Sequence, residues 1–136
     1  MKRSATANWK GSGKEGKGTV TADSGVLSAT PISYKTRFEE VQGTSSEELI
    51  AAAHSGCFSM KLSFILDEAG FTPDNIDTKC TITLENGAII ESHLEVKAKV
   101  PGIDAAKFKE CADNAKANCP ISKLLNTNIT IEASLA

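Results

Sequence analysis

Apolar and polar side chains alternate with a period of two along much of this chain, which is the pattern of half-buried β-strands. In residues 32–39 the even positions share one face of the predicted strand, and Arg37 lies on the opposite, more polar face. Residues 78–84 and 90–100 alternate on either side of Asn86-Gly87, a dipeptide that favours a tight hairpin turn. Shorter β-prone stretches span residues 5–9, 19–21 and 129–133.

A helical period predicts one long helix from Ser45 to about Ala69. Ser45 and Glu48 have the spacing of a capping box, and Gly70 is placed to end the helix. Apolar residues form two adjacent stripes along it, which is wider than a surface helix needs. We therefore expect a central helix that packs on more than one side, with small residues between 51 and 56 that would let another backbone approach closely.

A second, shorter helix is predicted after Pro101-Gly102, with Asp104 placed to cap it. Cys119 comes directly before Pro120, and a residue before proline avoids the helical conformation, so Cys119 is expected at the frayed end of this helix. Three β segments, a long helix, a hairpin, a helix and a strand then follow one another. This order predicts an α+β fold in a single domain over residues 1–136, with antiparallel strand pairing.

Composition excludes several classes of protein. The chain has 136 residues and a formal net charge of -2, so no face is basic enough to neutralise many phosphates of a nucleic acid. No apolar run approaches the roughly 18 residues that a membrane-spanning helix needs, and the basic start at Met1 has no apolar segment behind it. We expect a cytoplasmic protein without a membrane partner, whose four cysteines are free or redox-active thiols.

Cys57 lies in the middle of the long helix and is the first candidate for chemistry. It is either a small core residue or a nucleophile, and only the thiolate form of a cysteine is reactive. The helix dipole helps little about three turns from the helix N-terminus, so a lowered pKa would require a cation from elsewhere. Arg37 is the best source of one because a guanidinium is always charged, and Glu47 would orient it through a bidentate pair. The alternative is that Arg37 is a solvated strand residue and Glu47 only complements the helix dipole.

The remaining cysteines divide into one candidate and two core residues. Cys119, at a helix end, is expected to have the mobility that a second, resolving thiol needs, because two disulfide sulfurs must come within about 2 Å of each other. Cys111 lies inside the second helix, and Cys80 faces apolar neighbours on a strand. Both are expected in the core.

The two histidines leave alternatives open. His54 precedes Cys57 by one helical turn, so it is either a base for that thiol or a buried histidine that is hydrogen-bonded within the core. His93 is expected on the polar, exposed face of its strand. A zinc site built from His54, Cys57, Cys111 and Cys119 would lack the close-spaced ligand pairs typical of zinc sites.

These residues together resemble the OsmC/Ohr family of thiol peroxidases, in its OsmC branch. The resemblance covers nearly the whole chain and is carried by three blocks: Glu47 to Met60, Thr36 to Glu39 and Ala117 to Ser122. Further matching blocks are Lys17 to Val20, Ser24 to Leu27, Glu68 to Pro73 and Val100 to Asp104.

The resemblance implies an intertwined α+β homodimer with antiparallel sheets around two long central helices. It implies reduction of organic hydroperoxides, and more weakly of hydrogen peroxide, in oxidative or osmotic stress defence. Carried over by motif, Cys57 is the peroxidatic thiol, Cys119 the resolving thiol, Arg37 the activating cation and Glu47 its carboxylate partner. No metal, haem or flavin cofactor is implied, and the external reductant is a dithiol, typically a lipoyl-bearing protein.

Two departures from the family pattern stand out, together with one consequence of spacing. Ser45-Ser46 replaces the usual Asn-Pro, and the hairpin at Asn86-Gly87 is shorter than usual, which bears on substrate preference. Glu47 and Cys57 are ten residues apart, which is about 15 Å along a helix. One arginine cannot then easily touch both within one chain, so we expect a composite site in which Arg37 and Glu47 come from the second subunit. The competing functions are a ligand-binding protein and a general thiol-disulfide oxidoreductase on the same fold.

Overall fold

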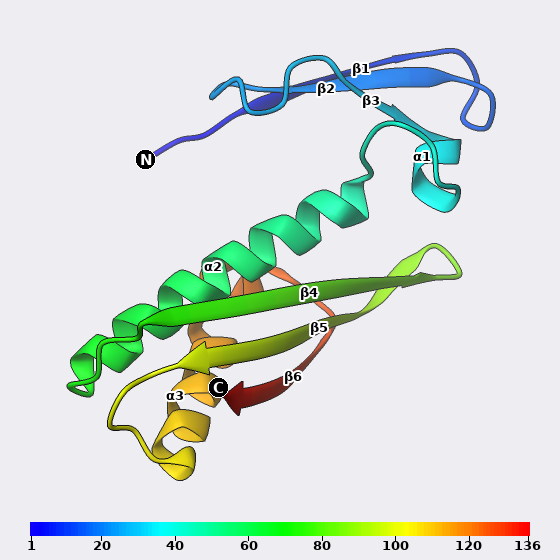
Figure 1. Cartoon of the computed structure of the whole chain (residues 1–136). Helices are drawn as coiled ribbons and strands as arrows, with labels where there is room; N and C mark the ends of the chain where they lie inside the picture. The colour runs from blue at the N-terminus through cyan, green and yellow to red at the C-terminus, as the bar shows by residue number, and fades with distance from the viewer. The chain divides into compact units, whose positions relative to one another are not determined.

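The computed structural model describes all residues from Met1 to Ala136 (Figure 1). Its contacts gather in two compact units, residues 1–49 and residues 50–136, and the boundary falls inside the long helix. The single domain expected over the whole chain stays a prediction, and each unit is described by itself. The elements are β1 (Ala5–Lys10), β2 (Lys17–Ala22), β3 (Thr30–Ser33), α1 (Tyr34–Phe38), α2 (Ser46–Glu68), β4 (Asn75–Glu85), β5 (Ala88–Lys99), α3 (Ala105–Asn118), α4 (Pro120–Leu124) and β6 (Asn128–Leu135).

The first unit is a small antiparallel sheet in the order β1-β2-β3. Trp9 of β1 lies opposite Gly18 of β2. A Cβ atom on Gly18 would lie 2.7 Å from Cε3 of the Trp9 ring and 2.4 Å from the Asn8 carbonyl oxygen, so only glycine allows this close packing. The ring stays partly exposed.

The predicted strand over residues 32–39 is wrong beyond Ser33, because the chain turns there into the short helix α1. Ser33 and Thr36 form a reciprocal capping box, in which each side chain bonds the backbone N–H of the other. This box satisfies donors at the helix start and overrides the alternating pattern. Arg37 therefore lies on α1 and not on a strand.

The long predicted helix is confirmed as α2, Ser46–Glu68. The Ser45 hydroxyl accepts a hydrogen bond from the Glu48 backbone N–H at 3.1 Å, which is half of the expected capping box. The Glu48 carboxylate instead accepts a bond from the Thr44 hydroxyl at 2.9 Å. At the other end, the Phe71 N–H bonds the Leu66 carbonyl and closes the helix.

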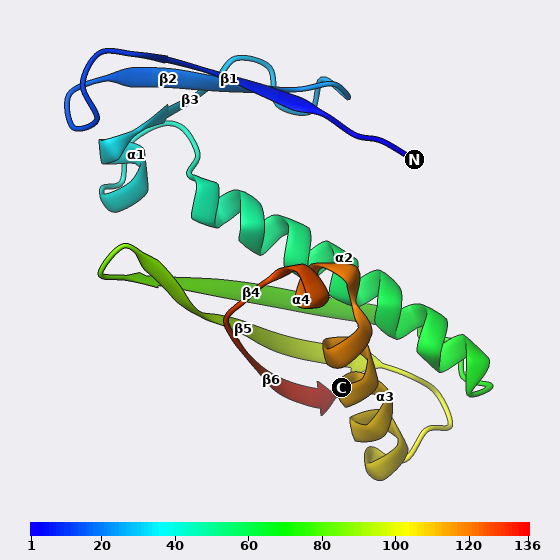
Figure 2. The same ribbon diagram turned by 180° about the vertical axis from the view of Figure 1, so that it is seen from behind.

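The second unit holds a three-stranded sheet in the order β4-β5-β6 (Figure 2). The hairpin at Asn86-Gly87 is confirmed, and both residues have positive φ, 51° and 78°. β5 and β6, however, run parallel, so the expectation of purely antiparallel sheets is wrong for this pair. The reason is the connection: α3 and α4 carry the chain back across the sheet before β6 begins, as parallel neighbours require.

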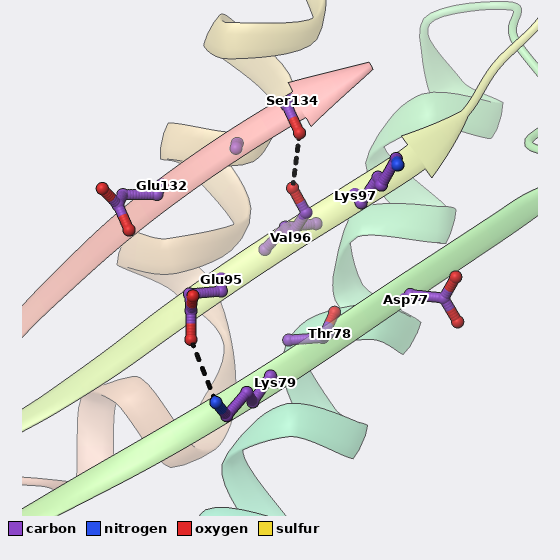
Figure 3. Close-up of a pocket in the computed structure, with 9 residues that line it drawn as sticks. Asp77, Thr78, Lys79, Glu95, Val96, Lys97, Glu132 and Ser134 are labelled. Carbon is purple, nitrogen blue, oxygen red and sulfur yellow. Dashed lines mark hydrogen bonds and ion pairs between the residues drawn. The ribbon is translucent and has the colours of Figure 1, made fainter. Parts of the chain in front are cut away.

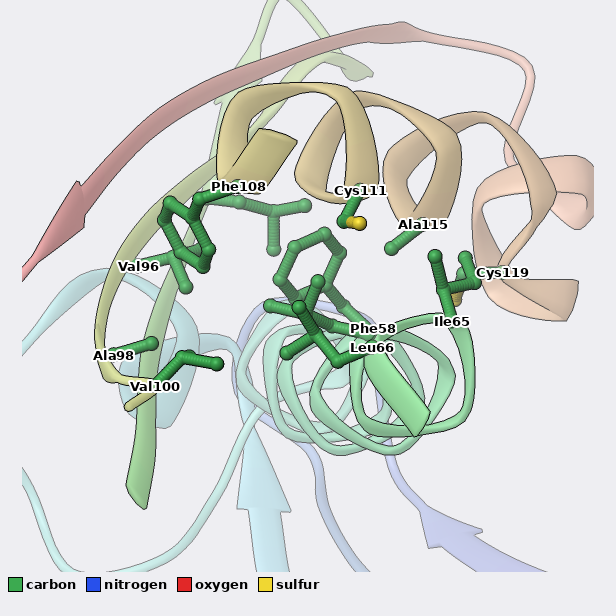
Figure 4. Packing of buried hydrophobic residues seen from close by; sticks show 12 residues of the cluster. Phe58, Ile65, Leu66, Val96, Ala98, Val100, Phe108, Cys111, Ala115 and Cys119 are labelled. Atoms are coloured by element: carbon green, nitrogen blue, oxygen red, sulfur yellow. The ribbon is translucent and has the colours of Figure 1, made fainter. Parts of the chain in front are cut away.

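One face of this sheet and the helices α2 and α3 enclose the core of the second unit (Figure 4). Leu94 and Ala98 of β5 are fully buried, as are Phe58 and Leu62 of α2, and Phe108 of α3 is nearly so. Burying a ring such as that of Phe58 contributes about 2–3 kcal/mol. The opposite face of β5 carries the polar side chains, as its alternation predicts.

Cys119 lies at the end of α3, as predicted, but it is fully buried, so the expected fraying and mobility of this end are wrong. Asp104 caps α3 as expected, and its carboxylate accepts the Lys107 N–H at 2.7 Å. Cys119 then ends α3 in an extended conformation and at once begins α4, with Pro120 in the first helical position. Proline needs no N–H bond there, so the same residue that stops α3 starts the next helix.

Helix α2 is long and apolar enough to cross a membrane, judged by length and composition alone. Its apolar residues are interrupted by polar ones such as His54 and Lys61, so the helix contains no unbroken apolar run of this length. A central core helix passes the same test, because it is apolar on more than one side. The buried side chains of α2 include Phe58, Leu62 and Leu66, which lie within the core of the second unit.

Candidate active site

Cys57 and Cys119 lie side by side in the second unit as free thiols. Cys57 projects from the middle of α2 and is partly buried. Cys119 joins α3 to α4, and its thiol is hydrogen-bonded with that of Cys57. The backbone N–H of Ile121, in the first turn of α4, also bonds the Cys57 sulfur. Two cysteines 62 positions apart are thus brought into contact by the junction of two helices.

The surroundings of Cys57 within the second unit do not activate it. Burial raises the pKa of the Cys57 thiol above its ordinary value of 9.0, and the bond with Cys119 raises it further. The Ile121 N–H acts in the opposite direction and lowers this pKa, because it stabilises the thiolate. None of these groups is a cation, so the thiol needs a positive charge from another source to ionise near neutral pH.

Arg37 and Glu47 form an ion pair in the first unit, as their sequence positions predict. Arg37 Nε donates to Glu47 Oε1 at 2.8 Å, and Arg37 Nη2 donates to the same oxygen. The expected bidentate geometry, with one nitrogen on each oxygen, is therefore not formed. Glu47 Oε2 is buried without a hydrogen-bond partner.

The ion pair shifts the pKa values of both partners so that each side chain favours its charged form. The hydrogen bond to Glu47 raises the pKa of Arg37, and the bond from Arg37 lowers the pKa of the Glu47 carboxyl. The Glu47 side chain is 13% exposed and that of Arg37 is 44% exposed. The carboxylate is thus held in the protein, whereas much of the guanidinium surface is open to another molecule.

A hollow of about 180 Å³ lies beside Arg37 in the first unit. Apolar and aromatic side chains contribute to its lining, from Trp9 of β1, Ile32 of β3 and Tyr34 of α1. Hydroxyls of Thr44 and the following serines line the remaining side. A guanidinium beside an apolar wall is suited to a ligand with one polar end and one apolar end.

His54 is fully buried and hydrogen-bonded, which bears out one of its two predicted roles. Its Nδ1 lies 2.6 Å from the Ser92 hydroxyl of β5, and its Nε2 lies 2.8 Å from the Ser122 hydroxyl of α4. Burial lowers the pKa of His54, so the ring is neutral at neutral pH. Both nitrogens are occupied, and neither is free to accept the proton of Cys57.

The remaining candidate residues, Cys111, Cys80 and His93, lie outside both pairs and pack or hydrogen-bond within the second unit. Cys111 is buried in the core, as expected, and burial raises the pKa of its thiol. The Cys80 sulfur is partly buried, 3.2 Å from the Ser92 hydroxyl. His93 is half-buried and not simply exposed, because its ring bonds Thr130 at 2.5 Å and Glu132 at 3.1 Å on β6. No group of three or more His, Cys, Asp or Glu side chains in the chain is placed to hold a metal ion.

Another hollow, of about 450 Å³, is lined by none of the cysteines or histidines and by neither Arg37 nor Glu47. Figure 3 shows it on the polar face of the second sheet, lined by charged side chains including Lys79, Glu95 and Glu132. An ion pair between Lys79 and Glu95 at 3.7 Å crosses it. It is an open part of a solvent-facing sheet, and no thiol lines it.

The predicted site residues thus form two pairs, Cys57 with Cys119 and Arg37 with Glu47, one in each unit. Sequence reasoning missed the two serines that bind His54, Ser92 and Ser122. Ser92 interrupts the apolar face of β5 at an even position, and a polar residue on a core face was a signal that a buried partner exists. It also missed Ile121, because a backbone N–H has no signature in a sequence.

Comparison with known proteins identifies the family of the chain. Residues 39–134 match the family model described as OsmC-like protein. Peroxiredoxin OsmC of Escherichia coli (strain K12) is 48% identical over 133 residues, which cover 95% of this chain and 93% of that protein. The organic hydroperoxide resistance protein of Xanthomonas axonopodis pv. citri is 31% identical over 97 residues, 69% of this chain and 68% of that one.

Solved structures share the fold at lower identity. The OsmC-like protein of Mycoplasma pneumoniae has a TM-score of 0.78 at 14% identity, covering 100% of this chain and 98% of that one. The organic hydroperoxide resistance protein OhrB of Bacillus subtilis has a TM-score of 0.66 at 23% identity, covering 98% of each chain. The family match over most of the chain and the 48% identity to an OsmC peroxiredoxin show that this protein belongs to the OsmC family.

Proposed function

We propose that this protein is a two-cysteine thiol peroxidase that reduces organic hydroperoxides, and more weakly hydrogen peroxide. The observation that carries the proposal is the contact between the Cys57 and Cys119 thiols, with the Ile121 N–H bonded to the Cys57 sulfur. Family membership and the 48% identity to an OsmC peroxiredoxin support the same activity.

The proposed cycle begins at Cys57. Its thiolate attacks the distal oxygen of the hydroperoxide, the O–O bond breaks, an alkoxide leaves and is protonated, and Cys57 becomes a sulfenic acid. The Cys119 thiol then attacks the Cys57 sulfur, the S–O bond breaks, water leaves, and a disulfide forms. An external dithiol, such as a lipoyl group on a protein, returns both thiols by exchange and is itself oxidised to a disulfide.

Activation of Cys57 is assigned to Arg37 and Glu47 of a second copy of the chain. Within the second unit only burial, another thiol and one N–H act on the pKa of Cys57, so a cation is missing there. Arg37 offers an open guanidinium that Glu47 holds in place. A guanidinium beside the sulfur would lower its pKa and stabilise the charge that develops on the peroxide oxygens.

Helix α2 offers a surface for the second copy. Ala52, Gly56, Met60 and Phe64 recur every four residues on one exposed stripe, and Met60 and Phe64 are 64% and 59% exposed. Large apolar side chains so placed on a core helix are typical of a surface that another chain covers. Small residues at the N-terminal end of the stripe would let two such helices approach closely. A homodimer through α2 follows from this proposal.

The substrate tail is assigned to the hollow beside Arg37. Its apolar wall would bury the alkyl or aryl part of a hydroperoxide, at about 25 cal/mol for each Å² removed from water. Hydrogen peroxide has no such tail and gains none of this energy. We expect the protein to work in the cytoplasm, where lipoyl-bearing proteins and thiol reductants keep it cycling.

Stopped-flow oxidation by cumene hydroperoxide tests the activity. The parent protein is expected to consume one equivalent rapidly, and the Cys57→Ser variant none. Cys80→Ser is the matched control, because it removes a partly buried thiol that lies outside the proposed pair. Equal peroxide consumption by parent and Cys57→Ser would contradict the proposal, and reduction of protein disulfides without peroxide would favour a general oxidoreductase.

Mixed dimers test whether the site is shared between chains. Cys57→Ser and Arg37→Ala are each expected to be inactive as homodimers. A dimer with one copy of each variant retains one site with Cys57 and Arg37 intact, so it is expected to recover about half of the parental activity. A mixed dimer as inactive as its parents would show that both residues must act within one chain.

A further inference from the structure

His54 is the most buried polar side chain of α2, and the proposed chemistry leaves it without a role. It precedes Cys57 by one helical turn and has no exposed surface. Its two ring nitrogens bind two serines from different elements, Ser92 on β5 and Ser122 on α4. The ring therefore connects three elements: the helix that carries Cys57, a central strand and the short helix that follows Cys119.

Helix α4 has few ties to the rest of the second unit. It is five residues long, and it begins directly at Cys119, whose carbonyl accepts the Lys123 N–H. Ile121 packs against the core, and its N–H bonds the Cys57 sulfur. Ser122 is the only residue of α4 whose own side chain forms a hydrogen bond, and this bond joins it to His54 at 2.8 Å.

The hydrogen bond between Ser122 and His54 is difficult to replace. The neutral ring donates from one nitrogen and accepts at the other, so either tautomer can satisfy both serines if their hydroxyls turn accordingly. Ser92 has a further partner in the Cys80 sulfur at 3.2 Å, whereas Ser122 has no other. Because His54 is excluded from water, breaking the link would leave a buried polar nitrogen without a partner.

We propose that His54 is a positioning residue for disulfide formation: through Ser122 it holds α4, and with it the Cys119 thiol, against Cys57. The inference rests on the proposed function, since it assumes that the two thiols react. When Cys119 attacks the Cys57 sulfenic acid, the S–O bond breaks, water leaves, and the sulfurs must close to about 2 Å. Because the Ser122–His54 bond holds α4 directly after Cys119, the Cys119 sulfur stays close enough to attack Cys57.

The test separates the two steps of the reaction by quench-flow mass spectrometry with one equivalent of cumene hydroperoxide. The sulfenic acid is detected as one added oxygen and the disulfide as two lost hydrogens. In Ser122→Ala, disulfide formation is expected to slow about fivefold, as loss of one hydrogen bond predicts. Sulfenic acid formation is expected to slow less, because α4 influences it only through the Ile121 N–H. With excess peroxide, the longer-lived sulfenic acid should yield more sulfinic acid.

Ser92→Ala is the matched control, because it removes the other bond of the same ring and leaves α4 tied. Its two rates are expected to stay within about twofold of the parent, although it destabilises the same cluster. Ser122→Thr keeps a hydroxyl and should restore disulfide formation. Equal slowing in Ser92→Ala and Ser122→Ala, or an unchanged disulfide rate in Ser122→Ala, overturns the proposal.

A second measurement does not depend on peroxide chemistry. Cys119 is fully buried, so its alkylation by iodoacetamide reports movement of the α3–α4 junction. Ser122→Ala should raise this rate about fivefold and Ser92→Ala should leave it unchanged. If the parent forms no sulfenic acid but the alkylation result holds, the proposed function fails and the link survives. If sulfenic acid forms and neither rate depends on Ser122, the link fails and the function survives.

Discussion

At the scale of single residues, the protein surroundings favour the neutral form of Cys57 and the charged forms of Arg37 and Glu47. Burial holds the Cys57 thiol in its neutral form, and the Ile121 N–H only partly opposes this. The Arg37–Glu47 pair stays charged, because each partner stabilises the ionised form of the other. In the proposed mechanism, the Cys57 thiol becomes a reactive thiolate only when the Arg37–Glu47 pair of a second copy lies beside it.

Glu47→Gln is expected to change how stability depends on pH. The pKa of Glu47 is lowered from 4.5 in the folded protein, so its contribution to stability is present above 4.5 and is lost as the pH falls through the lower folded value. Because Arg37 is widely exposed, the contribution at pH 7 should be below about 1 kcal/mol. Urea unfolding of both proteins from pH 7 down to pH 3 measures the difference.

Glu39→Gln is the control for this experiment, since Glu39 is exposed and forms no ion pair. The curves of the parent and Glu47→Gln should converge toward acid pH, and those of the parent and Glu39→Gln should run together throughout. A difference between parent and Glu47→Gln that grows toward acid pH would contradict the assigned pair.

At the scale of elements, two short helices position candidate site residues, one of them Arg37 and the other Cys119. The one-turn helix α1 carries Arg37, and the equally short α4 begins at Cys119. Each is fixed by a local device, a capping box at Ser33 in one case and Pro120 with the His54 bond in the other. Such elements are sensitive to single substitutions, because no long helix or sheet supports them.

Ser33→Ala is expected to loosen α1 and with it Arg37. Loss of the cap should lower the free energy of unfolding by about 1 kcal/mol, and peroxidase activity should fall by more than stability alone explains. Thr19→Ala on β2, in the same unit, is the control, because it removes a hydroxyl that takes no part in the Ser33–Thr36 capping box. Denaturation and cumene hydroperoxide turnover measure the two effects, and an unchanged turnover in Ser33→Ala would contradict the role of α1.

Trp9→Ala is expected to act on the substrate tail. The ring of Trp9 forms part of the wall beside Arg37, so its loss should raise KM for cumene hydroperoxide severalfold and leave turnover of hydrogen peroxide nearly unchanged. Val26→Ala, an exposed apolar residue outside this hollow, is the control. Equal loss with both peroxides would show that Trp9 supports the fold of the first unit and not the substrate.

Sequence patterns predicted the elements well where one signal dominated. The period of α2, the Asn86-Gly87 hairpin and the Asp104 cap are each strong local signals, and all three are confirmed. The pattern failed after Ser33, where side chains that alternate also form a capping box, and at Cys119, where a proline starts a helix as well as ending one. Local competition between two valid signals cannot be resolved without the tertiary context.

At the scale of the whole molecule, the direction of β6 and the bond from His54 to α4 could not be predicted from the sequence pattern. Strand direction depends on where a crossover returns the chain, and the alternation of residues 129–133 is the same for either direction. The two pairs of candidate site residues could be proposed from the sequence, because the residue types of thiols and opposite charges indicate their chemistry. Ser122 and Ile121 act through position alone, and serines or backbone groups carry no such mark.

Assembly through α2 is tested by Phe64→Glu. A carboxylate on the exposed apolar stripe should remain solvated in a monomer and be buried unpaired in a dimer. We expect a shift from dimer to monomer in analytical ultracentrifugation, together with loss of peroxidase activity. Lys97→Glu, on the polar face of the second sheet, is the control. A dimeric and active Phe64→Glu protein would show that α2 does not form the interface.

The most direct test of the two-cysteine chemistry is the mass of the intact protein after one equivalent of cumene hydroperoxide. We expect a loss of two hydrogens, and peptide mapping should find a single crosslink between Cys57 and Cys119. Cys119→Ser should instead gain one oxygen on Cys57. An unchanged mass, or a crosslink that involves Cys80 or Cys111, would contradict the assignment of the reacting thiols.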